Sequence, residues 1–376
     1  LDWEQEKKLL DRIADLYEAH RQTRDATRRA ELYREIDRLS NEAARLVAPN
    51  EYDKLAASLG AAGTNAYTWV EQTVYVNEIP ANELGRWMAL EAERFRGLAL
   101  RLFHTELETV YEEFNISQDR DFRKVNNTLR AALFPRHPYG TQTTLGTAEH
   151  LRNPSMHHIQ RFFQTYYVPN NMAIVLAGAF DPDDAVRLAE AHFGKLEARP
   201  LPPFTYEEQP PLEGPLRHEV VGREAPYLQL AWRLDGAATD APLMAALLQQ
   251  LLYNEQAGLL DLHLNQEQRV LESEAWMWSY EDFSAFGLYG KAREGQSLEA
   301  VEQLLLAELD RVRRGAIDDW LLEAVLNDLK LGYLESSEQN AARVSAMTNM
   351  FVLGVDWARF VQRIDWMAQV SVEQLA

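Results

Sequence analysis

The segment "RPLPPFTYEEQPPLEGP", residues 199–215, contains six prolines among 17 residues. Proline has no backbone N–H and a fixed φ angle, so neither a helix interior nor a central strand tolerates this density. We therefore predict a linker at residues 205–216 that joins two folded domains, residues 49–204 and 217–376. The length of 376 residues favours two domains, because a single core seldom grows beyond about 250–300 residues.

Both sides of this linker show strands and helices in a mixed order without strict alternation. Before the linker, hydrophobic periodicity and turn residues predict strands within 60–80, helices at 82–98, 102–118 and 155–167, a strand within 170–178 and a helix at 181–194. After the linker they predict a strand at 226–234, a helix at 240–254, strands within 270–292 and helices at 297–314 and 317–335. The expected fold class is α+β, with two similar units, each a largely antiparallel sheet with helices packed on one face.

Residues 1–48 precede these elements, and we predict that they form a helical hairpin inserted in the first domain. Apolar residues recur every three or four positions in its second arm, at Leu32, Ile36, Leu39, Ala43 and Leu46. Asp25 is a suitable N-cap for this arm, and Pro49 ends it. Because most other positions of the hairpin are charged, we expect it to be an appendage.

The composition excludes several classes of function. A net charge of −20 argues against nucleic acid as a partner, because phosphates need a basic surface. The absence of cysteine excludes disulfides and cysteine-ligated zinc, so any zinc ligand must be His, Asp or Glu. No apolar run approaches the length that a membrane span needs. The chain begins at Leu1 in an amphipathic segment, and we interpret it as cut from a longer protein.

The predicted helix at 102–118 contains the segment "HTELETVYEEFN", residues 104–115, with four glutamates. Its apolar face is formed by Phe103, Leu107, Val110 and Phe114. Glu108 and Glu112 point away from that face, as solvated side chains do. Glu106 and Glu113 lie two turns apart at the edge of the face, where a carboxylate needs a cation, hydrogen bonds or a metal. The sequence pattern is compatible with two interpretations of this pair, a metal site and a solvated surface.

A complete catalytic zinc site cannot be built from the motifs of this sequence. Such a site takes three protein ligands and leaves the fourth position to water. The nine histidines include no pair spaced by four residues, and neither H-E-x-x-H nor H-x-x-E-H occurs. No glycine-rich phosphate loop and no G-x-S-x-G motif is present, and His137, before Pro138 in a loop, is expected to be structural.

Four segments, in this order and spacing, resemble the pitrilysin/insulinase family of zinc metallopeptidases. They are "GAAGTNAYTWVEQTVY" (60–75), "RFRGLALRLFHTELETVYEEFN" (94–115), "HPYGTQTTLGTAEHL" (137–151) and "YYVPNNMAIVLAGAFDP" (166–182). The likeness is strongest over residues 50–200 and is greatest to long bacterial members with an early helical insertion. It implies that H-x-x-E-H supplies two zinc-binding histidines and a general base. It also implies that Glu113 is the third zinc ligand and that Glu106 supports the site.

The resemblance further implies that peptide substrates bind as an added β-strand beside Asn65 and Ala66. The H-x-x-E-H block is expected upstream of the hairpin, so the zinc site of this chain is expected to be incomplete. Its expected partners are then the remaining N- and C-terminal segments of the same protein.

The expected function is part of a zinc endopeptidase that hydrolyses oligopeptides, with this fragment itself inactive. The alternative is a non-catalytic homologous subunit that acts in peptide binding or assembly. The resemblance to bacterial members suggests a periplasmic location, which the sequence itself leaves undecided.

Overall fold

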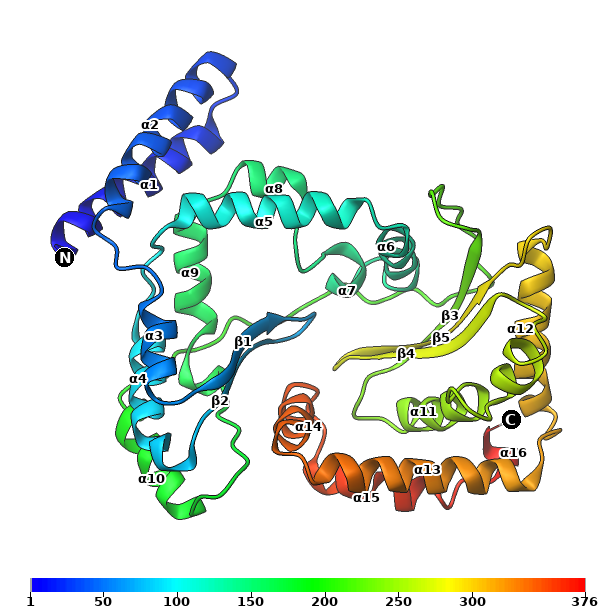
Figure 1. Cartoon of the computed structure of the whole chain (residues 1–376). Coiled ribbons are helices and arrows are strands. Elements are labelled where there is room, and N and C mark those ends of the chain that lie inside the picture. The colour runs from blue at the N-terminus through cyan, green and yellow to red at the C-terminus, as the bar shows by residue number, and fades with distance from the viewer. Residues whose placement is uncertain (1, 376) are drawn as a thin grey trace. The chain divides into compact units, whose positions relative to one another are not determined.

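The computed structural model describes residues 2–375 and divides into two compact units (Figure 1). Unit 1 comprises the residues up to 127 together with 136–174 and 178–211. Unit 2 comprises 128–135, 175–177 and the residues from 212 onward. The main change of unit therefore falls inside the proline-rich segment. Unit 2 also includes residues 128–135 and 175–177, which lie outside the predicted second domain at 217–376. The boundaries of that domain stay a prediction.

Unit 1 is mainly helical. Its elements are α1 (Trp3–Gln22), α2 (Ala26–Ala44), α3 (Glu51–Ser58), β1 (Ala62–Thr68), β2 (Thr73–Glu78), η1 (Ala81–Glu83), α4 (Leu84–Arg96), α5 (Phe103–Gln118), α6 (Asp121–Leu133, which ends in unit 2), α7 (Pro138–Thr141), α8 (Ala148–Arg152), α9 (Met156–Tyr166), η2 (Pro169–Asn171) and α10 (Pro182–Phe193). The strand predicted within 170–178 is wrong, because residues 172–177 pair with no strand of the described chain.

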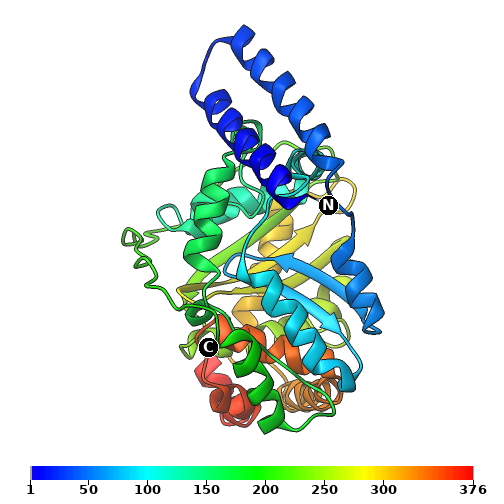
Figure 2. The same cartoon turned by 90° about the vertical axis from the view of Figure 1, so that its left-hand side faces the viewer.

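Helices α1 and α2 form the predicted antiparallel hairpin, which projects from the rest of unit 1 (Figure 2). Side chains cap both helices, because Asp2 accepts the N–H of Gln5 and Asp25 accepts the N–H of Arg28. The apolar stripes of the two helices meet in a buried cluster of Ile13, Ala14, Leu16, Tyr17, Leu32, Ile36, Leu39 and Ala43. Met156 of α9 belongs to the same cluster, so the hairpin shares its core with the body of unit 1.

Strands β1 and β2 form an antiparallel pair with a register shift between Ala62 and Asn65. Behind β2, the guanidinium of Arg94 lies 4.3 Å from the ring centres of both Tyr52 and Tyr75. The buried carboxylate of Glu91 accepts hydrogen bonds from Arg94 and from the hydroxyl of Tyr52. An aromatic and ionic network therefore connects β2 to α3 and α4.

Unit 2 contains a three-stranded antiparallel sheet of order β3-β5-β4. Its elements are β3 (Tyr227–Asp235), α11 (Ala241–Leu252), the π-helical turn η3 (Asp261–Asn265), β4 (Glu272–Ser279), β5 (Phe283–Lys291), α12 (Leu298–Arg313), α13 (Asp319–Ser337), α14 (Asn340–Val352), α15 (Trp357–Met367) and α16 (Val372–Leu375). Residues Phe286 and Leu288 of β5 share a buried core with Val301 and Leu305 of α12. The guanidinium of Arg130, from the end of α6, lies 4.3 Å from the ring centre of Trp278 in β4.

The observed architecture agrees with the predicted α+β class, since both sheets are antiparallel and small and most of the chain is helical. Among residues 2–375, no helix combines the length and the apolar character that a membrane span requires.

Candidate functional site

Helix α5 holds the glutamates that the sequence singled out. It is continuous from Phe103 to Gln118, so Glu106 and Glu113 lie seven residues apart on one helix. Seven residues are close to two full turns, which leaves only about 20° between the two side-chain directions. Both side chains are exposed. Within the described chain neither carboxylate has a hydrogen-bond or ion-pair partner. The oxygens of both carboxylates are therefore free to bind a group that lies outside the described residues.

The apolar stripe of α5 packs beside this glutamate side. Phe103 and Leu107 lie against the core of the α1–α2 hairpin, and Val110 and Phe114 are half-buried. On the side of the helix opposite to Glu106 and Glu113, His104 is buried and forms a hydrogen bond of 2.6 Å with the Tyr17 hydroxyl. Helix α5 therefore has one anchored side and one open side.

Strand β1 is open along its length. All seven of its residues are exposed, and β2 is its only strand partner in the described structure. Asn65 pairs with Val76 and Ala66 pairs with Tyr75. The Ala66 N–H is held by the side chain of Asn65, at 2.8 Å from Oδ1. Such an edge strand presents unpaired backbone groups to which an extended peptide can add.

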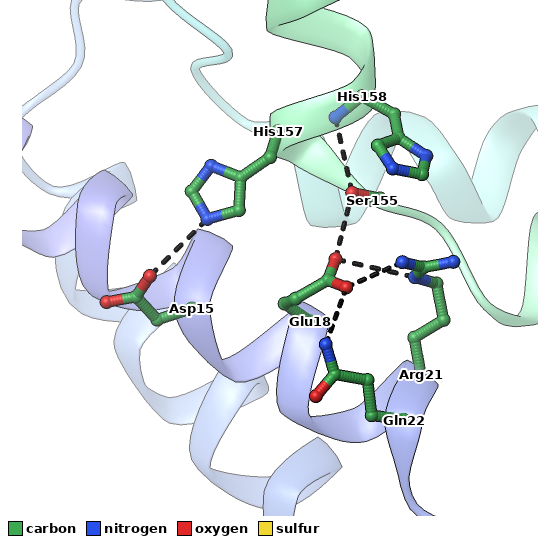
Figure 3. Close-up of polar contacts among 7 residues, drawn as sticks. All are labelled: Asp15, Glu18, Arg21, Gln22, Ser155, His157 and His158. Carbon is green, nitrogen blue, oxygen red and sulfur yellow. Dashed lines mark hydrogen bonds and ion pairs between the residues drawn. The ribbon is translucent and has the colours of Figure 1, made fainter.

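A metal site is not assembled within the chain. Across residues 2–375, no three His, Asp or Glu side chains come close enough together to hold a metal ion. Nε2 of His157 lies 3.4 Å from Asp15, and the Ser155 hydroxyl accepts the backbone N–H of His158 as the N-cap of α9 (Figure 3). The two carboxylates on the open side of α5 are fewer than the three protein ligands of a catalytic zinc site.

The junction of α1 and α9 was not foreseen from the sequence. Figure 3 shows the Ser155 hydroxyl, at the N-cap of α9, donating to Glu18 of α1 at 3.0 Å. Hydrogen bonds from Arg21 first, and then from Gln22 and Ser155, lower the pKa of Glu18 to about 2 against the opposing effect of burial. The capping position of Ser155 is visible in the sequence, but no periodic pattern indicates a partner 137 residues away.

His137 is fully buried, in agreement with a structural role. Its Nδ1 accepts the N–H of Tyr139, and its ring centre lies 3.9 Å from that of Tyr139 and 4.2 Å from that of Tyr206. The Tyr139 hydroxyl donates to Glu71 in the turn between β1 and β2. These contacts connect the middle of the proline-rich segment, at Tyr206, to the turn between β1 and β2.

The family model described as the Peptidase M16 inactive domain matches residues 155–329 of this chain. A probable mitochondrial-processing peptidase subunit beta from Arabidopsis thaliana is 22% identical over 330 residues, which are 83% of this chain and 61% of that protein. The probable zinc protease PqqL of Escherichia coli is 28% identical over 145 residues, which are 36% of this chain and 15% of that protein. The chain thus spans less than two thirds of the curated relatives that it matches.

Solved structures show the same fold. A protease from Helicobacter pylori superimposes with a TM-score of 0.80 at 20% identity, covering 88% of this chain and 80% of that one. The periplasmic protease PqqL from Escherichia coli gives a TM-score of 0.71 at 20% identity, covering 87% of this chain and 39% of that one. The family match, the curated relatives and the solved structures agree in making this chain similar to M16 proteins, the pitrilysin/insulinase family that the four sequence segments resemble.

Proposed function

We propose that this chain is part of a zinc-dependent endopeptidase in which α5 supplies one metal ligand and β1 binds the peptide. The observation that carries the proposal is the pair Glu106 and Glu113, exposed on one side of α5 without a partner in the described residues. The names of the similar proteins, zinc protease and processing peptidase, agree with such a chemistry. The sequence has no H-x-x-E-H motif, so we place the two histidines and the general base in polypeptide beyond these 376 residues.

The roles proposed for the two glutamates are those that the family resemblance implies. Glu113 would bind the metal through a carboxylate oxygen, and Glu106, two turns earlier on the same side, would accept a hydrogen bond from a histidine ligand and hold its orientation. When bound, zinc lowers the pKa of a coordinated water to about 7 and so supplies a nucleophile at neutral pH. A lone carboxylate competes poorly with water for such a cation, so the isolated chain should bind zinc weakly.

The peptide-binding part of the proposal rests on β1. An incoming strand would pair with backbone groups along the open edge beside Asn65 and Ala66, which demands little of the peptide sequence. We also propose an exported, periplasmic protein, because a similar solved structure is of a periplasmic protease.

The test uses the full-length gene product and three glutamine variants of α5. Glu113→Gln should lose zinc, because a neutral amide oxygen is a weak ligand. Glu106→Gln should keep most of the metal and lose activity by about 10–100-fold, as second-layer partners of metal ligands do. Glu108→Gln, a matched control on another side of the same helix, should change neither. Metal content is measured by elemental analysis and activity by cleavage of a quenched fluorescent peptide.

Two results would overturn this proposal. One is an equal loss of zinc from Glu108→Gln and Glu113→Gln. The other is zinc-dependent peptide cleavage by residues 1–376 alone.

The second candidate is a non-catalytic homologous subunit that binds peptides or assembles with an active partner. It is favoured by the match to a domain described as inactive and by the absence of a three-ligand cluster from residues 2–375. A full-length protein that binds peptide without binding zinc would support this candidate over the first.

A further inference from the structure

The α1–α2 hairpin is built into the support of α5. Helix α1 contacts α9, and α2 contacts α5. Phe103 and Leu107, from the first turns of α5, pack against the hairpin cluster that also contains Met156 of α9. The hairpin and the glutamate-bearing helix therefore share one hydrophobic core.

One polar contact lies inside this shared core. The Tyr17 hydroxyl and Nδ1 of His104 are 2.6 Å apart, in a hydrogen bond between residues 87 positions apart in the chain. Tyr17 is 1% exposed and His104 is 8% exposed. Burial first, and then the nearby Tyr33 and Glu108, raise the pKa of Tyr17, so it remains a neutral hydroxyl. The Tyr17 ring also packs edge-on against Phe103, at 5.5 Å between ring centres.

The other ring nitrogen of His104 is held less directly. Its Nε2 lies 3.8 Å from Asp37 of α2 and 3.9 Å from Glu108, both beyond ordinary hydrogen-bond distance. Both carboxylates are well exposed, and pairs of this kind contribute little. The Nδ1 contact with Tyr17 is therefore the specific polar link between His104 and the hairpin.

The geometry of α5 connects this link to the glutamates. At about 100° per residue, Glu106 and Glu113 point about 200° and 180° away from His104, on the opposite side of the helix. The helix begins after Leu102, which has a left-handed φ of 55°, and no side chain of the described residues caps it. Because the first turn lacks a cap, its rotation depends on contacts made by its side chains.

We propose that Tyr17 and His104 are positioning residues: their hydrogen bond sets the rotation of α5 and thereby the direction of Glu106 and Glu113. The proposed metal role gives this direction its purpose, so in that respect the inference rests on the proposed function. The hairpin then supports α5. Removing the hydroxyl of Tyr17 should change the direction of Glu106 and Glu113 on the opposite side of that helix.

The test uses the isolated chain, whose lack of cysteine allows nitroxide labels only where cysteines are introduced. Lys7 of α1 and Glu112 of α5, both exposed, are replaced by labelled cysteines, and the distance between labels is measured by pulsed electron paramagnetic resonance. Tyr17→Phe should broaden the distance distribution and speed amide exchange in the first half of α5 about tenfold. Tyr33→Phe is the matched control, because the Tyr33 ring also contacts His104, at 5.3 Å, and should change neither measurement.

Two substitutions of His104 separate its ring nitrogens. Asparagine places an amide group near the position of Nδ1, so His104→Asn should keep the narrow distribution. Glutamine extends toward the position of Nε2, so His104→Gln should broaden it as Tyr17→Phe does. If Tyr17→Phe and His104→Gln both leave the distribution narrow, or if glutamine rescues where asparagine fails, the inference is overturned. The proposed function fails separately, through unchanged zinc content in Glu113→Gln of the full-length protein.

Discussion

Replacing Gly290 by alanine should destabilise unit 2, because α12 packs directly on the backbone of β5 at this position. Gly290 pairs with Leu228 and Ser273 on the two neighbouring strands, so it lies in the middle of the sheet. A β-carbon at this position would lie 2.5 Å from Cγ1 of Val301 and 2.9 Å from Cδ1 of Leu305. Both residues of α12 are fully buried, so neither can turn aside without disturbing the core.

Two effects of opposite sign set the expected magnitude. Adding a methyl group to a packed core costs about 1–3 kcal/mol of unfolding free energy. Replacing glycine restricts the unfolded chain and returns about 0.4–1 kcal/mol. The expected net loss is about 1–2 kcal/mol. Gly332→Ala is the matched control, since a β-carbon in this part of α13 would meet no atom within 4 Å, and it should stabilise by about 1 kcal/mol.

The assay is urea unfolding followed by tryptophan fluorescence. Six of the nine tryptophans belong to unit 2: Trp232, Trp276, Trp278, Trp320, Trp357 and Trp366. The transition of this unit should move to lower urea for Gly290→Ala and to higher urea for Gly332→Ala. Equal shifts of the same sign would refute the close packing of α12 on β5 from which the argument starts.

Met156→Ala should lower the unfolding free energy by about 2–5 kcal/mol and speed amide exchange in the hairpin, because Met156 fills the core between α9 and α1; unchanged exchange would contradict this packing. Arg21 holds the pKa of Glu18 at about 2, so its carboxylate stabilises the fold above pH 4.5, and that stability disappears as the pH falls from 4.5 toward 2. Glu18→Gln should flatten this part of the stability profile, measured as the urea midpoint against pH. Burial, and then Glu272, raise the pKa of Glu274, so its ionised form opposes folding, and Glu274→Gln should raise the thermal midpoint at pH 7 but not below pH 4.

The sequence allowed the elements to be predicted better than the contacts between them. The stripe from Leu32 to Ala43 predicted the second arm of the hairpin, because helix periodicity is a local property. The apolar run at 172–177 has the composition of a strand, but a strand also needs a partner, and none is present among the described residues. The seven-residue spacing of Glu106 and Glu113 correctly placed them on one side of α5, while their roles stay predictions.

The attachment of the hairpin illustrates what a single sequence does not contain. The links from Tyr17 to His104 and from Glu18 to Ser155 join positions 87 and 137 residues apart. Each of these residues is individually common on a helix or at a cap, and no spacing relates one partner to the other. The many charged positions of the hairpin predicted an appendage, and composition does not distinguish the few side chains that attach it.

The open edge of β1 has a consequence for how the protein must be handled in solution and in the cell. Natural sheets protect their edge strands with charged side chains, especially lysine, or with proline. The β1 segment "AGTNAYT" contains neither a charged residue nor a proline. Its chief protection is the irregular pairing near Gly63, which interrupts the strand at one end. The unpaired backbone groups of such an edge would pair equally with a foreign peptide and with an unfolded copy of the same chain. We therefore expect concentrated or partly denatured preparations to aggregate through this strand, and an added extended peptide should reduce that aggregation.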